Sequence, residues 1–292
     1  MNYKIIPTYS FTSMKKENYK EVICVHHYLN QLSNKTQPPG LADFLRGTIA
    51  LWKKCNIHNV TLRINTDHPI FKWLDPCYHS TTEIYPPVRE YLSTLIGYNS
   101  IPNLLDEAFA SKQSFSVSTN AFYNDTNWGV IPDGAKTFIR TIMSSSSIKK
   151  YVNSIYSDLD IQEKGYKIIH LRFGDKYINT NLFHEDIANN IIQEIKSMEK
   201  SKYVLLSDSS TFAKYICSFI PSLIYWDNKK VHIGEVQLIG DGVDANVKDT
   251  LADFVIMSCS NFIYSLNDSG FSKSVSLIYD IPYSNLSTKF AY

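Results

Sequence analysis

The sequence predicts an α/β protein built from parallel sheets, in two Rossmann-like, doubly wound domains that face each other across a cleft. Short apolar strands alternate with amphipathic helices along the 292 residues, which is the pattern of βαβ units. Hydrophobic residues make up 44% of the chain and charged residues 20%, a composition that can fill the cores of two domains. A run of serines at 144–147 is the best candidate for a boundary, so we expect domains at 1–147 and 148–292.

The first half of the chain shows strand patterns separated by helical segments. Strands are expected at 21–29, 60–65 and 115–120. Helices are expected at 37–56, 101–111 and 135–159, the last interrupted by the serine run. The helix at 37–56 follows a Pro-Pro-Gly turn, and its apolar side chains recur at helical spacing: Leu41, Phe44, Leu45, Ile49 and Trp52.

The second half alternates more regularly between strands and helices. Strands are expected at 166–173, 202–209, 222–226 and 261–266. Helices are expected at 183–199, 210–220, 247–260 and 271–280. This alternation predicts a single parallel sheet, and ligands of such sheets bind at the carboxyl ends of the strands.

Charge, cysteine usage and hydropathy exclude several classes of protein. The net charge is +1 without a basic block, so a nucleic-acid backbone is not expected as a partner. The five cysteines form no C-x-x-C pair, which predicts reduced thiols in a cytosol-like compartment and no zinc site. The sequence has no signal-peptide-like segment and no apolar run of about 18 residues, so we expect a soluble cytoplasmic protein without a transmembrane segment. The absence of G-x-G-x-x-G after a strand disfavours a Rossmann-type oxidoreductase.

Three strands of the second half end in polar motifs. The motifs consist of His170, Arg172, Gly174 and Asp175 in the first, 207–210 in the second and 267–272 in the third. Because the strands are parallel, their carboxyl ends meet at one edge of the sheet. Each motif alone has a structural explanation, namely a salt bridge, a core histidine or a helix N-cap. Three of them in order on one sheet favour a ligand site.

The third motif has the features of a phosphate-binding turn. Ser269 and Gly270 allow close approach to the backbone, while the N–H groups of Phe271 and Ser272 begin a helix and expose its positive end. Arg172 can grip phosphate oxygens with two parallel hydrogen bonds. We therefore expect an arginine and a helix N-terminus to hold a diphosphate together.

The ordered motifs resemble those of the GDP-fucose-dependent fucosyltransferase superfamily, which includes the α1,2-, α1,6- and protein O-fucosyltransferases. The matches are H-x-R-x-G-D at 170–175, a strand ending in Ser-Asp at 207–208 and a third motif at 253–272. Gly270 stands where the family has a second serine. In the first half, Gly40, Ala42 and Asp43 occupy the places of a G-x-G-N-Q loop, which is a departure from the family. The resemblance covers about 166–280 and otherwise only this loop.

The resemblance implies a fold of the GT-B type and a role for each matched residue. The 1–147 half would hold the acceptor and the 148–292 half the nucleotide sugar. Arg172 would bind the β-phosphate, Asp253 the guanine N1 and N2 groups, and His170 the nucleotide. Asp208 would shape the nucleotide pocket, and 269–272 would cradle the diphosphate. Gly174 and Asp175 complete the donor-binding motif.

The implied reaction is the transfer of a sugar to a glycan hydroxyl with inversion, using L-fucose from GDP-fucose as the donor substrate. Negative charge grows on the diphosphate as the glycosyl bond breaks, and Arg172 with the helix amides can stabilise it, so neither a metal nor another cofactor is expected. The D-x-D triplet at 158–160 is interpreted as a solvated loop. Alternatives are a GDP-mannose or UDP-sugar donor and a non-catalytic nucleotide- or glycan-binding protein. The acceptor, the linkage and the oligomeric state are not specified by the sequence.

The first-half loop supplies the candidate for the general base. Asp43 can take the acceptor proton or orient the sugar, and Arg46, one helical turn on, can pair with it. An aspartate that stabilises the helix dipole is an equally good interpretation of Asp43. Asp175 is a second candidate for the base. For Asp253 the alternatives to guanine binding are helix capping and a solvent-facing position.

Overall fold

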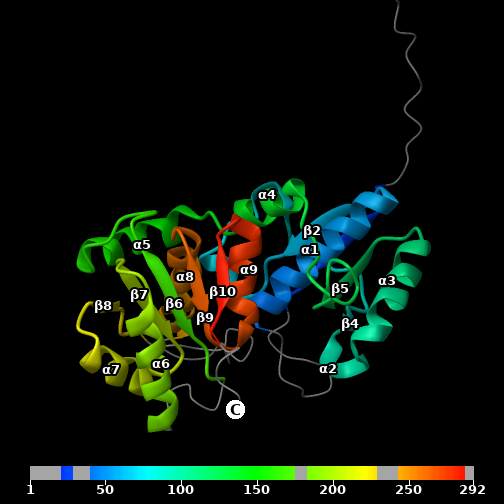
Figure 1. Cartoon of the computed structure of the whole chain (residues 1–292). Helices are drawn as coiled ribbons and strands as arrows, with labels where there is room; N and C mark the ends of the chain where they lie inside the picture. Colours follow the sequence, from blue (N-terminus) through cyan, green and yellow to red (C-terminus); the bar gives the residue numbers. More distant parts are fainter. Residues whose placement is uncertain (1–20, 29–39, 175–182, 229–242, 287–292) are drawn as a thin grey trace, which may run out of the picture.

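Two parallel sheets form the centre of the molecule (Figure 1). The structure is a computed structural model and describes residues 21–28, 40–174, 183–228 and 243–286. The first sheet contains β1 (Ile23–His26), β2 (Thr61–Asn65), β3 (Ser80–Thr81), β4 (Arg89–Tyr91) and β5 (Phe115–Thr119). The second contains β6 (Lys167–Leu171), β7 (Tyr203–Ser207), β8 (Leu223–Tyr225), β9 (Ile263–Ser265) and β10 (Tyr283–Asn285). All the pairings are parallel, so the predicted α/β class with parallel sheets is confirmed.

Helices connect the strands on both sides of each sheet. The longer ones are α1 (Leu41–His58), α3 (Ile101–Ala110), α4 (Asp133–Ile142), α5 (Ser146–Asp158), α6 (Glu185–Ser197), α7 (Ser210–Phe219), α8 (Val243–Ser258) and α9 (Gly270–Tyr279). Shorter turns are α2 (Ser93–Ile96) and the 3-10 helices η1 (Pro69–Lys72), η2 (Cys77–His79), η3 (Tyr98–Ser100) and η6 (Leu266–Asp268). In the described part of the chain, no helix combines the length and the hydropathy needed to cross a bilayer.

Every strand and helix predicted from the sequence has a counterpart in the structure. The serine run begins α5, because the Ser145 hydroxyl accepts a hydrogen bond from the N–H of Ser147 at 3.2 Å. The sequence missed β3, β4 and β10, which span two or three residues each and lie at the sheet edges. Strands so short and polar have no hydrophobic period to detect.

Both sheets are doubly wound. The strand orders are β3-β2-β1-β5-β4 and β10-β9-β6-β7-β8. In each sheet the chain first proceeds outward in one direction and then returns to the other side of the first strand. The order therefore reverses between β1 and β5 in the first sheet and between β6 and β9 in the second. These two reversals are the switch points at which ligands of open α/β sheets bind.

The helices between the two sheets share one hydrophobic core. The buried cluster includes Ile64 of the first sheet and Ile263 of the second, and α1 packs against α4, α9 and β5. Gly47 allows α1 to approach β5 closely, since a Cβ atom there would lie 1.8 Å from the carbonyl oxygen of Thr119. Figure 1 shows α1 and α9 side by side between the sheets. A cleft between two domains and a boundary at residue 147 stay predictions.

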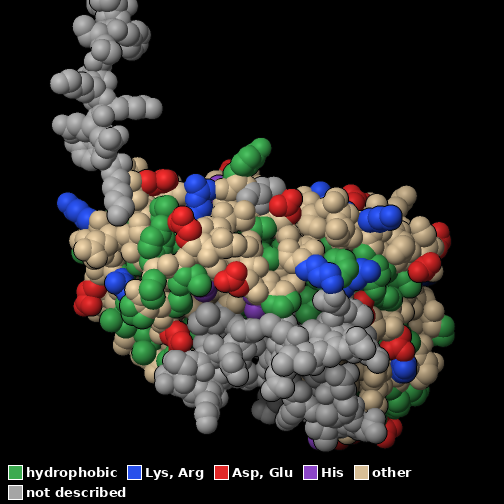
Figure 2. All heavy atoms as spheres, turned by 180° about the vertical axis from the view of Figure 1, so that it is seen from behind, with side chains coloured by type: hydrophobic (Ala, Val, Ile, Leu, Met, Phe, Trp, Pro, Cys, Tyr) green, Lys and Arg blue, Asp and Glu red, His purple; other side chains and the backbone are tan. Residues whose placement is uncertain are grey.

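Charged side chains add a polar contact between the two halves of the chain. The carboxylate of Asp280, which caps the C-terminus of α9, pairs with Lys136 and Arg140 of α4. Both cations lower the pKa of Asp280. Elsewhere, Lys and Arg side chains are interspersed with Asp and Glu over the face shown in Figure 2. This distribution agrees with the net charge of +1.

Candidate functional site

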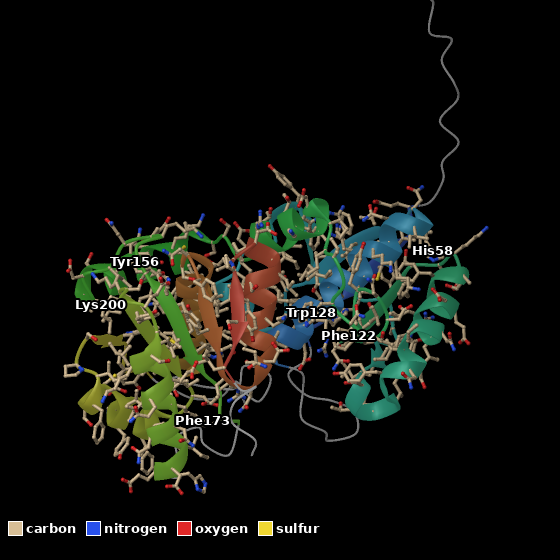
Figure 3. The ribbon with its side chains drawn as sticks, viewed as in Figure 1. His58, Phe122, Trp128, Tyr156, Phe173 and Lys200 are labelled. Atoms are coloured by element: carbon tan, nitrogen blue, oxygen red, sulfur yellow. The ribbon has the colours of Figure 1, made fainter. Side chains whose placement is uncertain are left out.

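The switch point of the second sheet brings two of the predicted motifs together. Arg172 directly follows β6, and η6 follows β9 and leads into α9. β6 and β9 are paired neighbours, with His170 opposite Ser265. Figure 3 shows Phe173 at this carboxyl edge of the sheet and Tyr156 near the opposite edge. The topology thus forms the edge that the sequence predicted for a ligand.

The carboxylate of Asp208 organises the turn after β6. It accepts hydrogen bonds from the backbone N–H groups of Phe173 (3.0 Å) and Gly174 (2.9 Å) and from the guanidinium of Arg172. The side chain of Asp208 is 7% exposed, whereas that of Arg172 is 26% exposed. Three donors compensate a buried carboxylate for its lost hydration. Asp208 therefore fixes the position of the arginine while leaving part of the guanidinium at the surface.

Gly174 has a conformational role in the same turn. Its φ angle is 109°, a region that side chains with a Cβ rarely adopt, and no atom of the described residues lies within 4 Å of the place of a Cβ. The glycine of the first motif is therefore required for the path of the backbone. Asp175, the second candidate for the general base, lies outside the described residues.

The turn after β9 adopts an unusual backbone conformation. Asn267 and Asp268 have φ angles of 62° and 44°, in the left-handed region that Asn and Asp tolerate best after glycine. The Asn267 Nδ2 donates a hydrogen bond to the carbonyl oxygen of Arg172 at 3.3 Å, and the Asp268 N–H donates to Asn285 Oδ1 at 3.3 Å. The turn is thus tied to the ends of both neighbouring strands, β6 and β10. Asn267 was missed as a positioning residue because its role depends on this pairing.

The N-terminus of α9 lies at the same edge and has no side-chain cap. Ser269 is the N-cap residue but makes no capping hydrogen bond through its hydroxyl. Ser272 is fully buried and donates its hydroxyl hydrogen to Ser265 Oγ at 2.8 Å. The first turn of α9 can therefore offer a ligand backbone N–H groups and the positive end of the helix dipole rather than the Ser272 hydroxyl.

Residues predicted to hold the nucleotide base lie close to this turn. Asp253 of α8 is 5% exposed and accepts a hydrogen bond from Asn228 Nδ2 at 3.4 Å. The next residue, Phe254, packs edge-on against Phe271, with ring centroids 5.6 Å apart. The ring of Phe271 lies 6.0 Å from that of His170, so three predicted nucleotide residues form one neighbourhood. The interpretation of Asp253 as a solvent-facing residue is wrong, because helix α8 buries it.

Two features around Asp253 favour a ligand that donates hydrogen bonds. The Oδ1 atom of Asn228 is buried and has no hydrogen-bond partner among the described residues. The pKa of Tyr225 is raised by burial and by the negative charges of Asp227 and Asp253. Acceptors and negative charge therefore gather at this place. Asn228 was not predicted from the sequence. The available signal was its position three residues after the end of strand β8.

The start of α1 meets the start of α9. Gly40 is the N-cap of α1 and makes no side-chain cap. A Cβ atom at Gly270 would lie 3.9 Å from the Cβ of Ala42, so the two helix N-termini are in contact. The distance is an ordinary van der Waals contact, and it leaves room for the serine that the family has at this position. The structure thus brings the start of α1 next to the third motif, a contact that the sequence did not predict.

The predicted ion pair between Asp43 and Arg46 is confirmed. Arg46 Nη2 donates hydrogen bonds to Asp43 Oδ1 at 2.6 Å and to the Tyr98 hydroxyl at 2.9 Å. Arg46 Nε donates to the carbonyl oxygen of Asn120 at 2.8 Å. The guanidinium also lies over the ring of Phe122, 4.2 Å from its centroid. Arg46 is buried, while the Asp43 side chain remains 35% exposed. Asp43 is held in place and can still accept a further hydrogen bond.

The D-x-D triplet lies away from these residues. Asp158 ends α5 and Asp160 pairs with Lys202 at 3.6 Å, directly before the amino ends of β6 and β7. Both aspartates are exposed, so the predicted solvent exposure is confirmed, but Asp158 is the last residue of helix α5 and not part of a loop. Within the described ranges, no group of three or more His, Cys, Asp or Glu side chains is arranged to hold a metal ion. Independence of metals stays a prediction.

Fold and site together define an α/β protein in which an arginine and an uncapped helix N-terminus follow the two strands at a sheet switch point. No protein-family model matches the sequence, and no curated protein shows significant sequence similarity to it. Solved structures do match. NodZ α-1,6-fucosyltransferase co-crystallised with GDP has a TM-score of 0.58 at 14% identity, over 89% of this chain and 93% of that one. NodZ from Bradyrhizobium has a TM-score of 0.58 at 11% identity, over 93% of this chain and 97% of that one.

Two further fucosyltransferases share the architecture. An Arabidopsis thaliana FUT1 mutant in complex with GDP matches with a TM-score of 0.58 at 11% identity, over 93% of this chain and 72% of that one. POFUT1 in complex with GDP-fucose matches with a TM-score of 0.51 at 13% identity, over 91% of this chain and 97% of that one. The resemblance to the fucosyltransferase superfamily is thereby confirmed as a likeness of fold, and it extends over both halves of the chain.

Proposed function

We propose that the protein transfers L-fucose from GDP-fucose to a hydroxyl group of a glycan, with inversion at the anomeric carbon and without a divalent metal. One observation supports the proposal above all others: Arg172 and the uncapped start of α9 follow the two strands that flank the switch point of the second sheet. The likeness of fold to proteins crystallised with GDP and GDP-fucose supports the choice of donor.

The donor diphosphate would lie between Arg172 and the first turn of α9. As the bond from the anomeric carbon to the β-phosphate oxygen breaks, the diphosphate gains negative charge. The guanidinium and the amides of 270–272 stabilise that charge without reorganising, because Asp208 already holds the arginine and the helix fixes the amides. The start of α1 adds a second positive helix end close to Gly270.

The guanine base would be read by Asp253 with help from Asn228. A carboxylate accepts hydrogen bonds from the N1–H and N2–H groups of guanine, and uracil lacks this pair of adjacent donors. Asn228 orients Asp253 through its amide nitrogen and presents its oxygen as a further acceptor. The buried ring of His170 and the half-buried ring of Phe271 lie 6.0 Å apart and supply apolar surface for the nucleotide.

Asp43 is the candidate for the residue that receives the acceptor proton. Its carboxylate belongs to the first turn of α1, which meets the start of α9 at Ala42. Arg46 holds one oxygen, and the exposed part of the side chain can bind the acceptor hydroxyl. The hydroxyl oxygen would then attack the anomeric carbon on the face opposite the departing diphosphate, which gives inversion.

Calorimetry and a transfer assay test the proposal. We expect GDP to bind more tightly than UDP, and GDP-fucose to donate fucose to one of a panel of simple glycosides in the presence of EDTA. Tighter binding of UDP would contradict the donor assignment. Tight GDP binding with neither hydrolysis nor transfer would identify a binding protein of the same fold, and loss of transfer in EDTA would contradict metal independence.

A further inference from the structure

The first sheet has its own switch point, between β1 and β5. The ladder between these strands continues one residue beyond β1, since the N–H of His27 donates to the carbonyl oxygen of Val117 at 2.8 Å. Tyr28 comes next. His68 follows the neighbouring strand β2 and begins η1. Both side chains therefore stand at the carboxyl edge of the first sheet, where a doubly wound sheet binds ligands.

Tyr28 and His68 form a stacked pair. Their ring centroids lie 4.4 Å apart with an interplanar angle of 12°, and Tyr28 also stacks on Phe44 of α1 at 4.6 Å. His26 stacks on Phe44 as well, and its Nδ1 bonds to the Thr48 hydroxyl at 3.0 Å. Strand β1, the start of η1 and helix α1 thus hold the pair from separate directions.

One polar atom on each ring of the pair is buried without a partner among the described residues. Tyr28 and His68 are each 4% exposed, yet the Tyr28 hydroxyl and the His68 Nε2 have no hydrogen-bond partner among the described residues. A buried polar atom left without a partner costs about 1–3 kcal/mol. Two such atoms on one stacked pair therefore point to a molecule that completes their hydrogen bonds.

The chemistry of the pair is neutral. His68 Nδ1 accepts the N–H of Ile70 at 3.1 Å, so in the neutral ring the proton resides on Nε2, which becomes a donor. Burial lowers the pKa of His68 to about 4, and burial together with the charge of Asp43 raises the pKa of Tyr28. A neutral N–H donor and a hydroxyl suit an alcohol. The negative charge of Asp43 nearby disfavours a phosphate at this place.

We propose that Tyr28 and His68 form a hydroxyl-binding site for a neutral saccharide, and that this saccharide is the acceptor. The identification as acceptor rests on the proposed function; the binding of a hydroxyl does not. The site adjoins Phe44 and the charge of Asp43 in the first turn of α1, the helix whose start contacts Gly270. The acceptor would thus bind through neutral groups on one side of α1, while the donor diphosphate binds at the start of α9.

Side-chain NMR of the histidines in the full-length protein tests the site. Methyl β-D-galactopyranoside and methyl β-D-glucopyranoside serve as probes, with galacturonate as the anionic comparison. We expect at least one methyl glycoside to shift the His68 Nε2 signal, and we expect galacturonate to cause a smaller shift. Tyr28→Phe and His68→Asn should each lower the affinity for the glycoside on the order of tenfold and leave the affinity for GDP unchanged. The asparagine in His68→Asn can still accept the hydrogen bond from the N–H of Ile70.

Tyr156→Phe provides the matched control for stability. The Tyr156 hydroxyl is hydrogen-bonded to the Tyr166 hydroxyl at 2.8 Å, so its removal should lower the melting temperature. Tyr28→Phe removes a hydroxyl that has no partner among the described residues and should leave the melting temperature unchanged or higher.

Two results would overturn the site. The first is a Tyr28→Phe variant that loses as much stability as Tyr156→Phe with unaltered glycoside binding, which would indicate an internal water. The second is a His68 signal that none of the glycosides moves. Failure of the proposed function would appear separately, as absence of GDP binding in the wild-type protein.

Discussion

The two switch points of this protein have the same topology and opposite chemistry. At β6 and β9 the strand ends carry an arginine paired with a buried aspartate and lead into an uncapped helix N-terminus. In the first sheet the stacked, neutral tyrosine and histidine rings follow β1, which borders the switch point, and its other neighbour β2. In our two proposals, the doubly wound sheet fixes where each ligand binds, and the side chains at the strand ends select an anion or a neutral alcohol.

The difference also has a structural cost that falls on different groups. The second-sheet site must hold a charged pair in place, and Asp208 does so with three donors. The first-sheet site must keep histidines neutral inside the protein, and burial does so by lowering their pKa values. The charged site should be sensitive to loss of a partner, and the neutral site to acid.

The largest effect is expected from Asp208→Ala. The substitution leaves two backbone N–H groups without their acceptor and separates Arg172 from its counter-ion, so we expect unfolding to become easier by about 3 kcal/mol. Chemical denaturation measures this. Asp227→Ala is the control, because Asp227 pairs with Lys214 at the surface and should cost under about 1 kcal/mol. Equal losses for both variants would show that the turn does not depend on Asp208.

Arg172→Ala should abolish most of the activity with a nearly unchanged fold. We expect transfer to fall by about a hundredfold or more, the scale of losing one electrostatic donor to the transition state. Steady-state kinetics with GDP-fucose measures the loss. Arg63→Ala, on β2 of the first sheet, is the control and should retain activity. Retained activity in Arg172→Ala would remove the charged switch point from the mechanism.

Asp253→Ala should lower the affinity for GDP on the order of tenfold or more and leave the affinity for UDP nearly unchanged, because the lost hydrogen bonds are those to guanine. Calorimetry with both nucleotides gives the ratio. Asp249→Ala lies on the same helix and removes a hydrogen bond to the Tyr151 hydroxyl, 2.6 Å long, so it controls for damage to α8. An equal loss for GDP and UDP would argue against base recognition by Asp253.

Acid should weaken the fold through the neutral histidines of the first half. The pKa of His68 is lowered from 6.5 to about 4, so the unfolded chain takes up this proton first as the pH falls. Unfolding free energy should therefore decrease by up to about 1.4 kcal/mol per pH unit between about pH 6.5 and 4, and this contribution should level off below. His68→Asn should flatten the slope. An unchanged slope would show that His68 is not the group that titrates.

Hydrophobic period and turn residues were enough to predict most of the framework. Strand β6 and helix α9 were placed within two residues, since apolar runs and helical spacing are local properties. Strands β3, β4 and β10 were missed because two or three residues carry no hydrophobic period and are recognisable only from their pairing with a neighbouring strand. The pairing between Asp43 and Arg46 was predictable for the same local reason, three residues of helix.

Contacts between distant segments were beyond the reach of the sequence. Arg172 pairs with Asp208, which lies 36 residues further along the chain. The two residues are close because the register of β6 and β7 places Leu171 opposite Ser207. Asn267 and Asn228 act through neighbours that only folding supplies. The stacked pair of Tyr28 and His68 joins two strand ends of one sheet, and nothing in either local sequence reveals it.

The sequence by itself determined the kinds of element, their order and the polar residues that end each strand, because these depend on neighbours along the chain. The tertiary structure alone decided which strand ends meet at a switch point, which carboxylate pairs with the arginine, and that the Tyr28 hydroxyl and His68 Nε2 are buried without a partner among the described residues. Those outcomes depend on strand order and register, which are set by the packing of whole helices and sheets and not by any single segment.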